Sequence, residues 1–136
     1  MKREHSQAGF TLIELLVVLA IMAMLVGLVG PRVLGYMDDA RVKTTRIQMA
    51  GYRSALEIFR LDIGRYPTSD EGLLSLVEAS GQMPNWRGPY LDQRVANDPW
   101  GNPYVYMSDG RSQFSLLSLG RDGKEGGEGV DADISL

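Results

Sequence analysis

An acidic, glycine-rich stretch near the C-terminus holds the side chains best suited to binding a ligand. The segment from Ser118 to Ile134 contains five acidic residues and five glycines. Carboxylate and carbonyl oxygens are the ligands that calcium prefers, roughly six to eight of them per ion, and glycine permits sharp turns of the chain. Composition alone leaves two interpretations open, a flexible acidic tail and a cation-binding loop.

The spacing within this stretch excludes two common loop motifs. In an EF-hand count from Asp122, Gly127 and Asp133 fall on the expected sixth and twelfth positions. Lys124 and Gly126, however, occupy the third and fifth positions, where acidic residues or asparagine are required. No Gly-Lys-Ser/Thr sequence follows a glycine-rich run, so a phosphate-binding Walker loop is also excluded.

The composition leaves few routes to catalysis. There is no cysteine, and His5 is the only histidine, so removal of residues 1–9 would leave no imidazole for a catalytic triad or a histidine metal site. A net charge of −3 disfavours nucleic acid as a partner. Paired acids can perform acid–base hydrolysis, but the glycine-rich stretch has no flanking aromatic pocket, so we expect no enzyme built on Asp122, Glu125 and Glu128.

A long apolar run lies near the N-terminus. Phe10 to Gly30 is 21 residues with one charge, Glu14, and as a helix it spans roughly 30 Å, the thickness of a bilayer core. Lys2 and Arg3 precede the run and favour a cytoplasmic N-terminus, whereas Arg32, Arg41, Lys43 and Arg46 beyond the run weaken this argument from charge. An ionised acid in hydrocarbon costs about 2.5–3.5 kcal/mol, so Glu14 either reaches the interface or meets a buried cation. An ordinary secretory signal, whose apolar region is shorter and without acid, fits less well.

The residues around this acid resemble a known processing signal. Ala8-Gly9-Phe10-Thr11-Leu12-Ile13-Glu14 is similar to the class III signal of type IV pilins and type II secretion pseudopilins. The resemblance implies that a prepilin peptidase cleaves between Gly9 and Phe10 and methylates the new terminus at Phe10. It also implies that Glu14 pairs with the Phe10 ammonium of an adjacent subunit. Residues 1–9 are then a leader, and residues 10–34 a transmembrane and assembly segment.

The chain after the apolar run remains compatible with a helix. We expect one helix from Phe10 to about Leu61, amphipathic in its second half, with Pro31 causing a kink. Two stripes recur at helical spacing. One contains Ile47, Gly51, Ser54, Ile58 and Leu61, and the other contains Tyr52, Leu56 and Phe59.

Residues 35–136 are expected to form the globular domain. Thr68 or Ser69 could cap a short helix through about Ala79, and a loop follows from 81 to 93. Strands are expected at 103–107 and 113–119, with a hairpin turn at 108–111. The predicted class is α+β, a long helix packed on a small antiparallel sheet.

Two further segments resemble the major pseudopilins of the type II secretion system. They are the stretch from Arg65 to Val77, which contains Tyr-Pro-Thr and Gly-Leu-Leu, and the sequence Asp-Pro-Trp-Gly-Asn-Pro-Tyr at 98–104. We expect Tyr66, Trp100 and Tyr104 to serve core packing. The resemblance also implies a structural Ca²⁺ ion in the C-terminal loop, held by Asp122, Asp131 and Asp133 and by the Leu119 carbonyl.

The resemblance implies a protein that assembles with copies of itself. The expected function is a subunit of a periplasmic filament that drives export of folded proteins across the outer membrane of a Gram-negative bacterium. The chain would cross the inner membrane once, and its partners would be the minor pseudopilins, the inner-membrane assembly platform and the prepilin peptidase. The alternative is a type IV pilin for adhesion, motility or DNA uptake. The absence of cysteine favours the pseudopilin, because many type IV pilins close a C-terminal loop with a disulfide.

Overall fold

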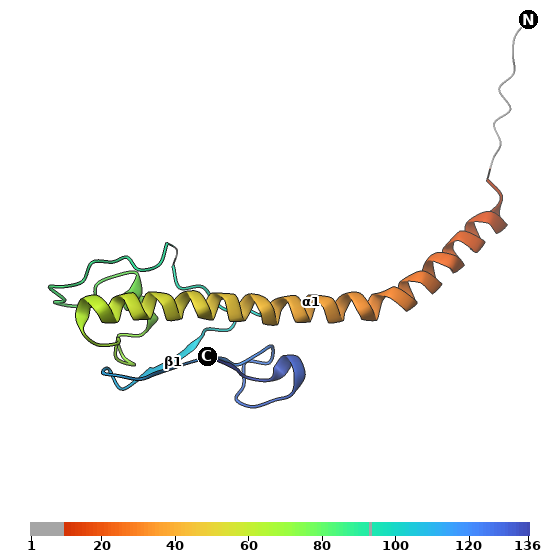
Figure 1. Ribbon diagram of the computed structural model, residues 1–136. Helices are drawn as coiled ribbons and strands as arrows, with labels where there is room; N and C mark the ends of the chain where they lie inside the picture. Colours follow the sequence, from red (N-terminus) through yellow and green to blue (C-terminus); the bar gives the residue numbers. More distant parts are fainter. Residues whose placement is uncertain (1–9, 93) are drawn as a thin grey trace, which may run out of the picture. The chain divides into compact units, whose positions relative to one another are not determined.

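One long helix dominates the computed structural model, which describes residues 10–92 and 94–136. Helix α1 runs over 52 residues, Leu12–Ile63 (Figure 1). This confirms the helix expected from Phe10 to about Leu61. Its backbone stays helical through Pro31, and the kink expected there stays a prediction. The described residues form two units, one ending at Met37 and the other running from Asp38 to Leu136.

The second half of α1 carries one side of the core of the globular unit. The stripe with Tyr52, Leu56 and Phe59 is buried, together with Met49 and Ala55. The other stripe faces away from the core: Ile47 is 72% exposed and Leu61 83% exposed. The helix is therefore amphipathic as expected, and only the aromatic stripe contributes to the core.

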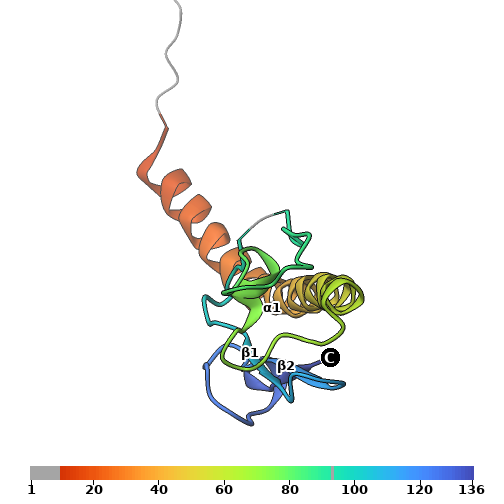
Figure 2. The ribbon, with the colours of Figure 1, turned by 90° about the vertical axis from the view of Figure 1, so that its left-hand side faces the viewer.

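A small sheet of three antiparallel strands completes this core. Strands β1 (Val105–Ser108) and β2 (Phe114–Ser118) pair with Val105 opposite Leu117, which confirms the expected hairpin within two residues at each end. Strand β3 (Ile134–Ser135), which the sequence did not predict, pairs with β2 on its other side. Leu116 and Ile134 are buried in the same cluster as the helix side chains, and the sheet lies beside the second half of α1 (Figures 1 and 2).

The short helix expected through about Ala79 is wrong in length and type. The structure has a single 3-10 turn, η1 (Leu73–Leu76). The expected cap by Thr68 or Ser69 is also wrong for η1, whose N-cap is Gly72 with no side-chain cap bond. Thr68 and Glu71 instead bond reciprocally in the preceding turn: the Thr68 hydroxyl accepts the Glu71 N–H, and Glu71 accepts the Thr68 N–H. Gly72 follows with φ of 60°, a left-handed conformation that cannot continue an α-helix. A second 3-10 turn, η2 (Gly129–Asp131), lies in the C-terminal loop.

Aromatic side chains close the core, as expected from the sequence. Tyr66 is 4% exposed, and its ring meets Phe114 edge-on at 4.9 Å. Tyr104 meets Tyr52 at 5.3 Å, and Trp100 packs against the same cluster. Burial raises the pKa of Tyr104 well above its ordinary value, and its hydroxyl donates to Gln48 at 2.6 Å. These residues hold the sheet and its connecting loops against the helix.

Candidate functional site

The N-terminal end of α1 carries an acid within an apolar surface. Glu14 and Thr11 form a reciprocal capping box: the Thr11 N–H and hydroxyl donate to Glu14 Oε2 at 2.9 and 3.0 Å. The Glu14 N–H in turn donates to the Thr11 hydroxyl at 3.3 Å. This arrangement satisfies donors that a helix start leaves unpaired. Among the residues that the structure describes, Thr11 is thus the partner of this carboxylate.

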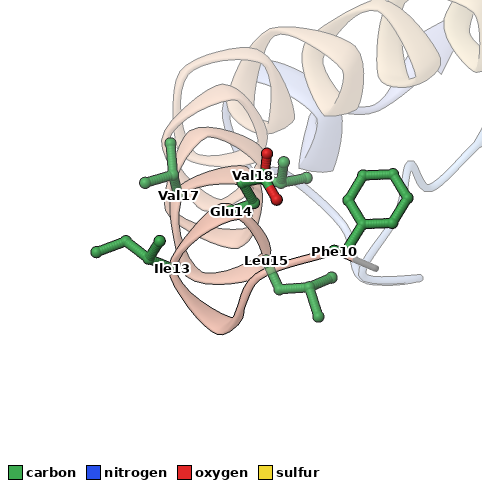
Figure 3. Close-up of a pocket in the computed structure, with 6 residues that line it drawn as sticks. All are labelled: Phe10, Ile13, Glu14, Leu15, Val17 and Val18. Atoms are coloured by element: carbon green, nitrogen blue, oxygen red, sulfur yellow. The ribbon is translucent and has the colours of Figure 1, made fainter. Parts of the chain in front are cut away.

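The surface around Glu14 is otherwise apolar. A shallow groove there is lined by Phe10, Ile13, Glu14, Leu15, Val17 and Val18. Figure 3 shows the Glu14 carboxylate beside Val18, with Ile13 and Val17 on another side of the helix. Every side chain from Phe10 to Val29 is exposed, and the helix is long and apolar enough to cross a membrane. The arrangement suits a lipid environment or the packing of several such helices. A single helix in water would leave all of this apolar surface in contact with solvent, which is unfavourable.

The expected cleavage site is only partly within the described residues. Phe10 lies two residues before the start of α1 and is 85% exposed. Gly9 and the rest of the expected leader lie outside the described residues. Phe10 and Glu14 are four residues apart in the sequence, which is about one helical turn, so both lie at the N-terminal end of α1.

The four expected calcium ligands lie in the loop that joins β2 to β3. Leu119 directly follows β2, and Asp133 directly precedes β3. Asp122 Oδ1 accepts the Lys124 N–H at 3.1 Å, and Asp133 Oδ2 accepts the Gly126 N–H at 3.0 Å. Because the two strands pair side by side, the loop's two ends meet at one edge of the sheet.

Asp131 lies in a different environment from the other two aspartates. Its carboxylate accepts two hydrogen bonds from Arg121, at 2.9 and 3.0 Å. These bonds raise the pKa of the Arg121 guanidinium further. Arg121 also lies 4.0 Å from Asp38 on α1. The side chain of Asp131 thus has a cationic partner within the protein, which the sequence did not predict.

The loop closes on itself through glycine positions. Gly120 and Gly127 have φ of 65° and 83°, and both abut the backbone of Asp131. A Cβ at Gly127 would fall on the Asp131 carbonyl oxygen, and one at Gly120 would lie 2.9 Å from it. Backbone bonds from Arg121 N–H to the Val130 carbonyl and from Asp133 N–H to the Gly126 carbonyl cross the loop. It is therefore a folded loop, and the flexible-tail interpretation is wrong.

The structure brings the expected ligands into one loop, but not into a formed metal cluster. Among residues 10–92 and 94–136, no group of three or more acidic or histidine side chains is placed to hold a metal ion. The three acids considered for hydrolysis, Asp122, Glu125 and Glu128, are all exposed on the surface of this loop. Folding of the loop thus orders its backbone without assembling its carboxylates.

Sequence reasoning missed the contacts that tie this loop to the rest of the domain. Asp98 is 4% exposed and accepts the hydroxyl proton of Ser118 at 2.6 Å, and the Asn102 side chain donates to the Gly120 carbonyl at 2.8 Å. The signal in the sequence is the stretch at 98–103, whose proline, glycine and asparagine residues indicate a turn but not the distant segment that it contacts.

The fold and these features define a pilin-like membrane-anchored protein, and comparison with known proteins specifies which one. The family model described as "Type II secretion system (T2SS), protein G" matches residues 32–136, and "Prokaryotic N-terminal methylation motif" matches residues 5–30. The chain therefore belongs to the type II secretion system protein G family. It is a structural subunit of the secretion pseudopilus and not an enzyme.

Individual relatives agree with this placement over nearly the whole chain. The chain is 40% identical to "Type II secretion system core protein G" of Pseudomonas aeruginosa, covering 97% of this chain and 96% of the relative. The protein of the same name from Vibrio cholerae is also 40% identical, covering 98% and 94%. The crystal structure of the major pseudopilin from enterohaemorrhagic Escherichia coli is 32% identical, with a TM-score of 0.60 over 75% of this chain and 90% of that one. Of the two expected functions, the pseudopilin is thus confirmed over the type IV pilin.

Proposed function

We propose that this chain is the major, repeating subunit of a periplasmic filament that drives export of folded proteins across the outer membrane. The observation that carries the proposal is the N-terminal half of α1, where every side chain from Phe10 to Val29 is exposed. Such a surface is stable in two settings, surrounded by lipid or surrounded by copies of itself. The same helix would hold the subunit in the inner membrane, crossing it once, and form the centre of the filament after assembly.

The globular unit from Asp38 to Leu136 would lie in the periplasm of a Gram-negative bacterium. Lys2 and Arg3 before the apolar run support this orientation, because positive flanks stay in the cytoplasm. Prepilin peptidase would cut between Gly9 and Phe10 and methylate Phe10. Minor pseudopilins and the inner-membrane assembly platform are the further partners, in keeping with membership of this family.

Glu14 would set the register between neighbouring subunits. The Thr11 capping box gives the carboxylate two hydrogen bonds but no opposite charge. A carboxylate buried among apolar helices is stable when a cation joins it. After cleavage, the Phe10 ammonium of an adjacent subunit supplies that cation, and a mispaired subunit would leave both charges buried and unpaired.

The test compares Glu14→Ala with Glu14→Gln and with the unchanged protein in cells that produce the secretion system. Both variants should enter the membrane fraction normally, because removing a charge favours insertion. Neither should form filaments or support secretion, although Gln keeps the length of the side chain and the capping box. Normal filaments from Glu14→Gln would overturn the role of charge in the pairing.

The same proposal includes a structural Ca²⁺ ion in the loop between β2 and β3. The donor set there fits calcium, since carboxylates and carbonyl oxygens predominate and thiol and imidazole ligands do not occur. Asp122 and Asp133 would be ligands, each using the carboxylate oxygen that accepts no hydrogen bond within the described part of the chain. The Leu119 carbonyl is the third ligand, and Asp131 would join after release from Arg121. The bound ion would neutralise acids that otherwise repel one another.

Thermal unfolding with calcium and with chelator tests this site in the full chain, purified in detergent. At a calcium concentration about 100 times the dissociation constant, binding stabilises a protein by about 2.7 kcal/mol, which is a rise of roughly 10 °C or more in Tm. Asp133→Ala should abolish the rise. Glu128→Ala is the matched control, because it removes the same charge from the same loop outside the ligand set. Equal calcium responses in both variants would contradict the site.

A further inference from the structure

The turn that begins at Asp98 is tied tightly to itself. Asp98 Oδ1 accepts the backbone N–H groups of Trp100 and Asn102, at 3.1 and 2.8 Å. The Asp98 N–H donates back to the Asn102 carbonyl at 2.8 Å, and the Gly101 N–H donates to the Asp98 carbonyl at 2.9 Å. These bonds give the turn one defined shape and hold the side chains of Asp98 and Asn102 in fixed positions.

The side chains of Asp98 and Asn102 extend from the turn to the start of the C-terminal loop. Asp98 Oδ2 accepts the Ser118 hydroxyl at 2.6 Å, and Ser118 is completely buried. Asn102 Nδ2 donates to the Gly120 carbonyl at 2.8 Å. A Cβ added to Gly123 would lie 3.0 Å from Asn102 Oδ1, so the loop also lies directly against this amide. The contacts join segments that are 18 to 20 residues apart in the sequence.

The two bonded loop residues stand on either side of Leu119. The Gly120 N–H, which belongs to the same peptide group as the Leu119 carbonyl, points back to the Ser118 hydroxyl at 3.4 Å. The neighbouring Gly120 carbonyl is bound by Asn102. Since a peptide group is planar and trans, the Leu119 carbonyl points opposite to the Gly120 N–H, so the bond to Ser118 restrains its direction. The Asn102 bond restrains the peptide group that follows.

We propose that Asp98 and Asn102 are positioning residues that order the C-terminal loop and aim the Leu119 carbonyl at the cation. The effect on calcium affinity rests on the calcium site proposed above. The ordering of the loop does not depend on the ion. Asp98 acts through Ser118, and Asn102 acts through Gly120. A loop ordered in advance binds its ion more tightly, because less conformational entropy is lost on binding.

The chain offers a matched control for this proposal within the same turn. Asn97 Nδ2 donates to the Gly101 carbonyl at 2.9 Å, so it makes the same kind of hydrogen bond as Asn102. That bond stays inside the turn and does not reach the loop. Asn97→Ala and Asn102→Ala therefore remove the same chemical group, and only the second breaks a contact with the loop.

The experiment is amide hydrogen exchange of residues 119–133 in the full chain in detergent micelles, first in chelator. Asn102→Ala should exchange about fivefold faster than the unchanged chain over this loop, the effect of one lost hydrogen bond on local opening. Asn97→Ala should leave the loop unchanged. The calcium dissociation constant, measured by titration calorimetry, should rise about fivefold in Asn102→Ala alone.

The outcomes separate this inference from the calcium site itself. If the unchanged chain binds no calcium, the proposed site fails, and the exchange comparison alone decides whether the positioning residues order the loop. If it binds calcium and the two asparagine variants match in exchange and affinity, the positioning role is wrong and the site stands. Should Asn102→Ala fail to fold, Ser118→Ala replaces it, because it removes the hydroxyl that donates to Asp98 and accepts the Gly120 N–H.

Discussion

Replacing Glu71 with glutamine removes one negative charge from the connection between α1 and the 3-10 turn η1. Arg65 donates two parallel hydrogen bonds to the Glu71 carboxylate, at 2.6 and 2.7 Å, and the Thr68 N–H adds a third at 2.7 Å. Glutamine keeps the size of the side chain and can still serve in the capping box with Thr68. The substitution therefore removes the charge together with one of the two Arg65 hydrogen bonds, because an amide nitrogen cannot accept from the guanidinium.

The size of the effect follows from the titration of this carboxyl. The Arg65 hydrogen bonds, with a smaller contribution from Thr68, lower the pKa of Glu71 from 4.5 to about 2. At about 1.36 kcal/mol per unit this corresponds to about 3.4 kcal/mol. The Arg65 side chain is 34% exposed, so water screens the pair, and we expect about 1–2 kcal/mol of unfolding free energy. For a domain of this size that is roughly 5–15 °C in Tm.

The pH dependence gives the prediction its sign. A carboxyl whose pKa is lower in the folded protein than in the unfolded chain stabilises the fold above the unfolded value. The stabilisation from Glu71 is therefore complete above about pH 4.5 and is lost as the pH falls towards about 2. The difference in Tm between the unchanged chain and Glu71→Gln should be largest near neutral pH and should vanish at the acid end.

The assay is thermal unfolding of the full chain in non-ionic detergent, followed by circular dichroism across this pH range. Glu78→Gln is the matched control, because Glu78 is an exposed carboxylate in the segment that follows η1. It should shift Tm by less than about 2 °C at every pH. An equal loss in both variants at neutral pH, or a difference that persists undiminished in acid, would refute the reasoning.

Two further substitutions test the core and the C-terminal loop. Phe59→Ala, at a completely buried position, should lower the unfolding free energy by about 3–5 kcal/mol, whereas Ile58→Ala, on the exposed face next to it, should cost under about 1 kcal/mol in the same urea titration. Gly127→Ala should make the loop open to proteolysis more than Gly126→Ala does. Both glycines have positive φ, but only at Gly127 would the new Cβ collide with the Asp131 carbonyl; equal cleavage rates would show that this collision is relieved.

The sequence predicts the elements that depend on local pattern. The spacing of Tyr52, Leu56 and Phe59 identifies a buried helix face, because helical periodicity places them together whatever they pack against. The apolar run around Glu14 likewise identifies the membrane segment by length and composition. The β1–β2 hairpin follows from alternating strands around turn residues.

Contacts between distant segments could not be predicted in this way. Strand β3 is two residues long, too short for any periodicity, and it exists because β2 offers an open edge. The Arg121–Asp131 and Asp98–Ser118 pairs depend on how the loop folds back, and nothing in local spacing specifies which acid meets which donor. The helix expected to reach Ala79 failed because the left-handed backbone at Gly72 outweighs the helical propensity of the leucines that follow.

The central claim is that Glu14 of one subunit meets Phe10 of the next, so neighbouring helices in the filament are offset by four residues. Leu12 of one subunit then lies level with Leu16 of its neighbour. The chain has no cysteine, so a pair of introduced cysteines can report this offset without disulfides from native cysteines. The pair Leu12→Cys with Leu16→Cys tests one helix face.

A second pair, Ile13→Cys with Val17→Cys, tests the adjacent face at the same offset. Oxidation in cells that assemble the filament brings disulfides only between residues whose Cα atoms lie within about 7 Å. We predict a ladder of cross-linked multimers for at least one of the two pairs, absent from each single cysteine and lost in the Glu14→Ala background. No ladder from either pair, or a ladder that persists without Glu14, would contradict the account.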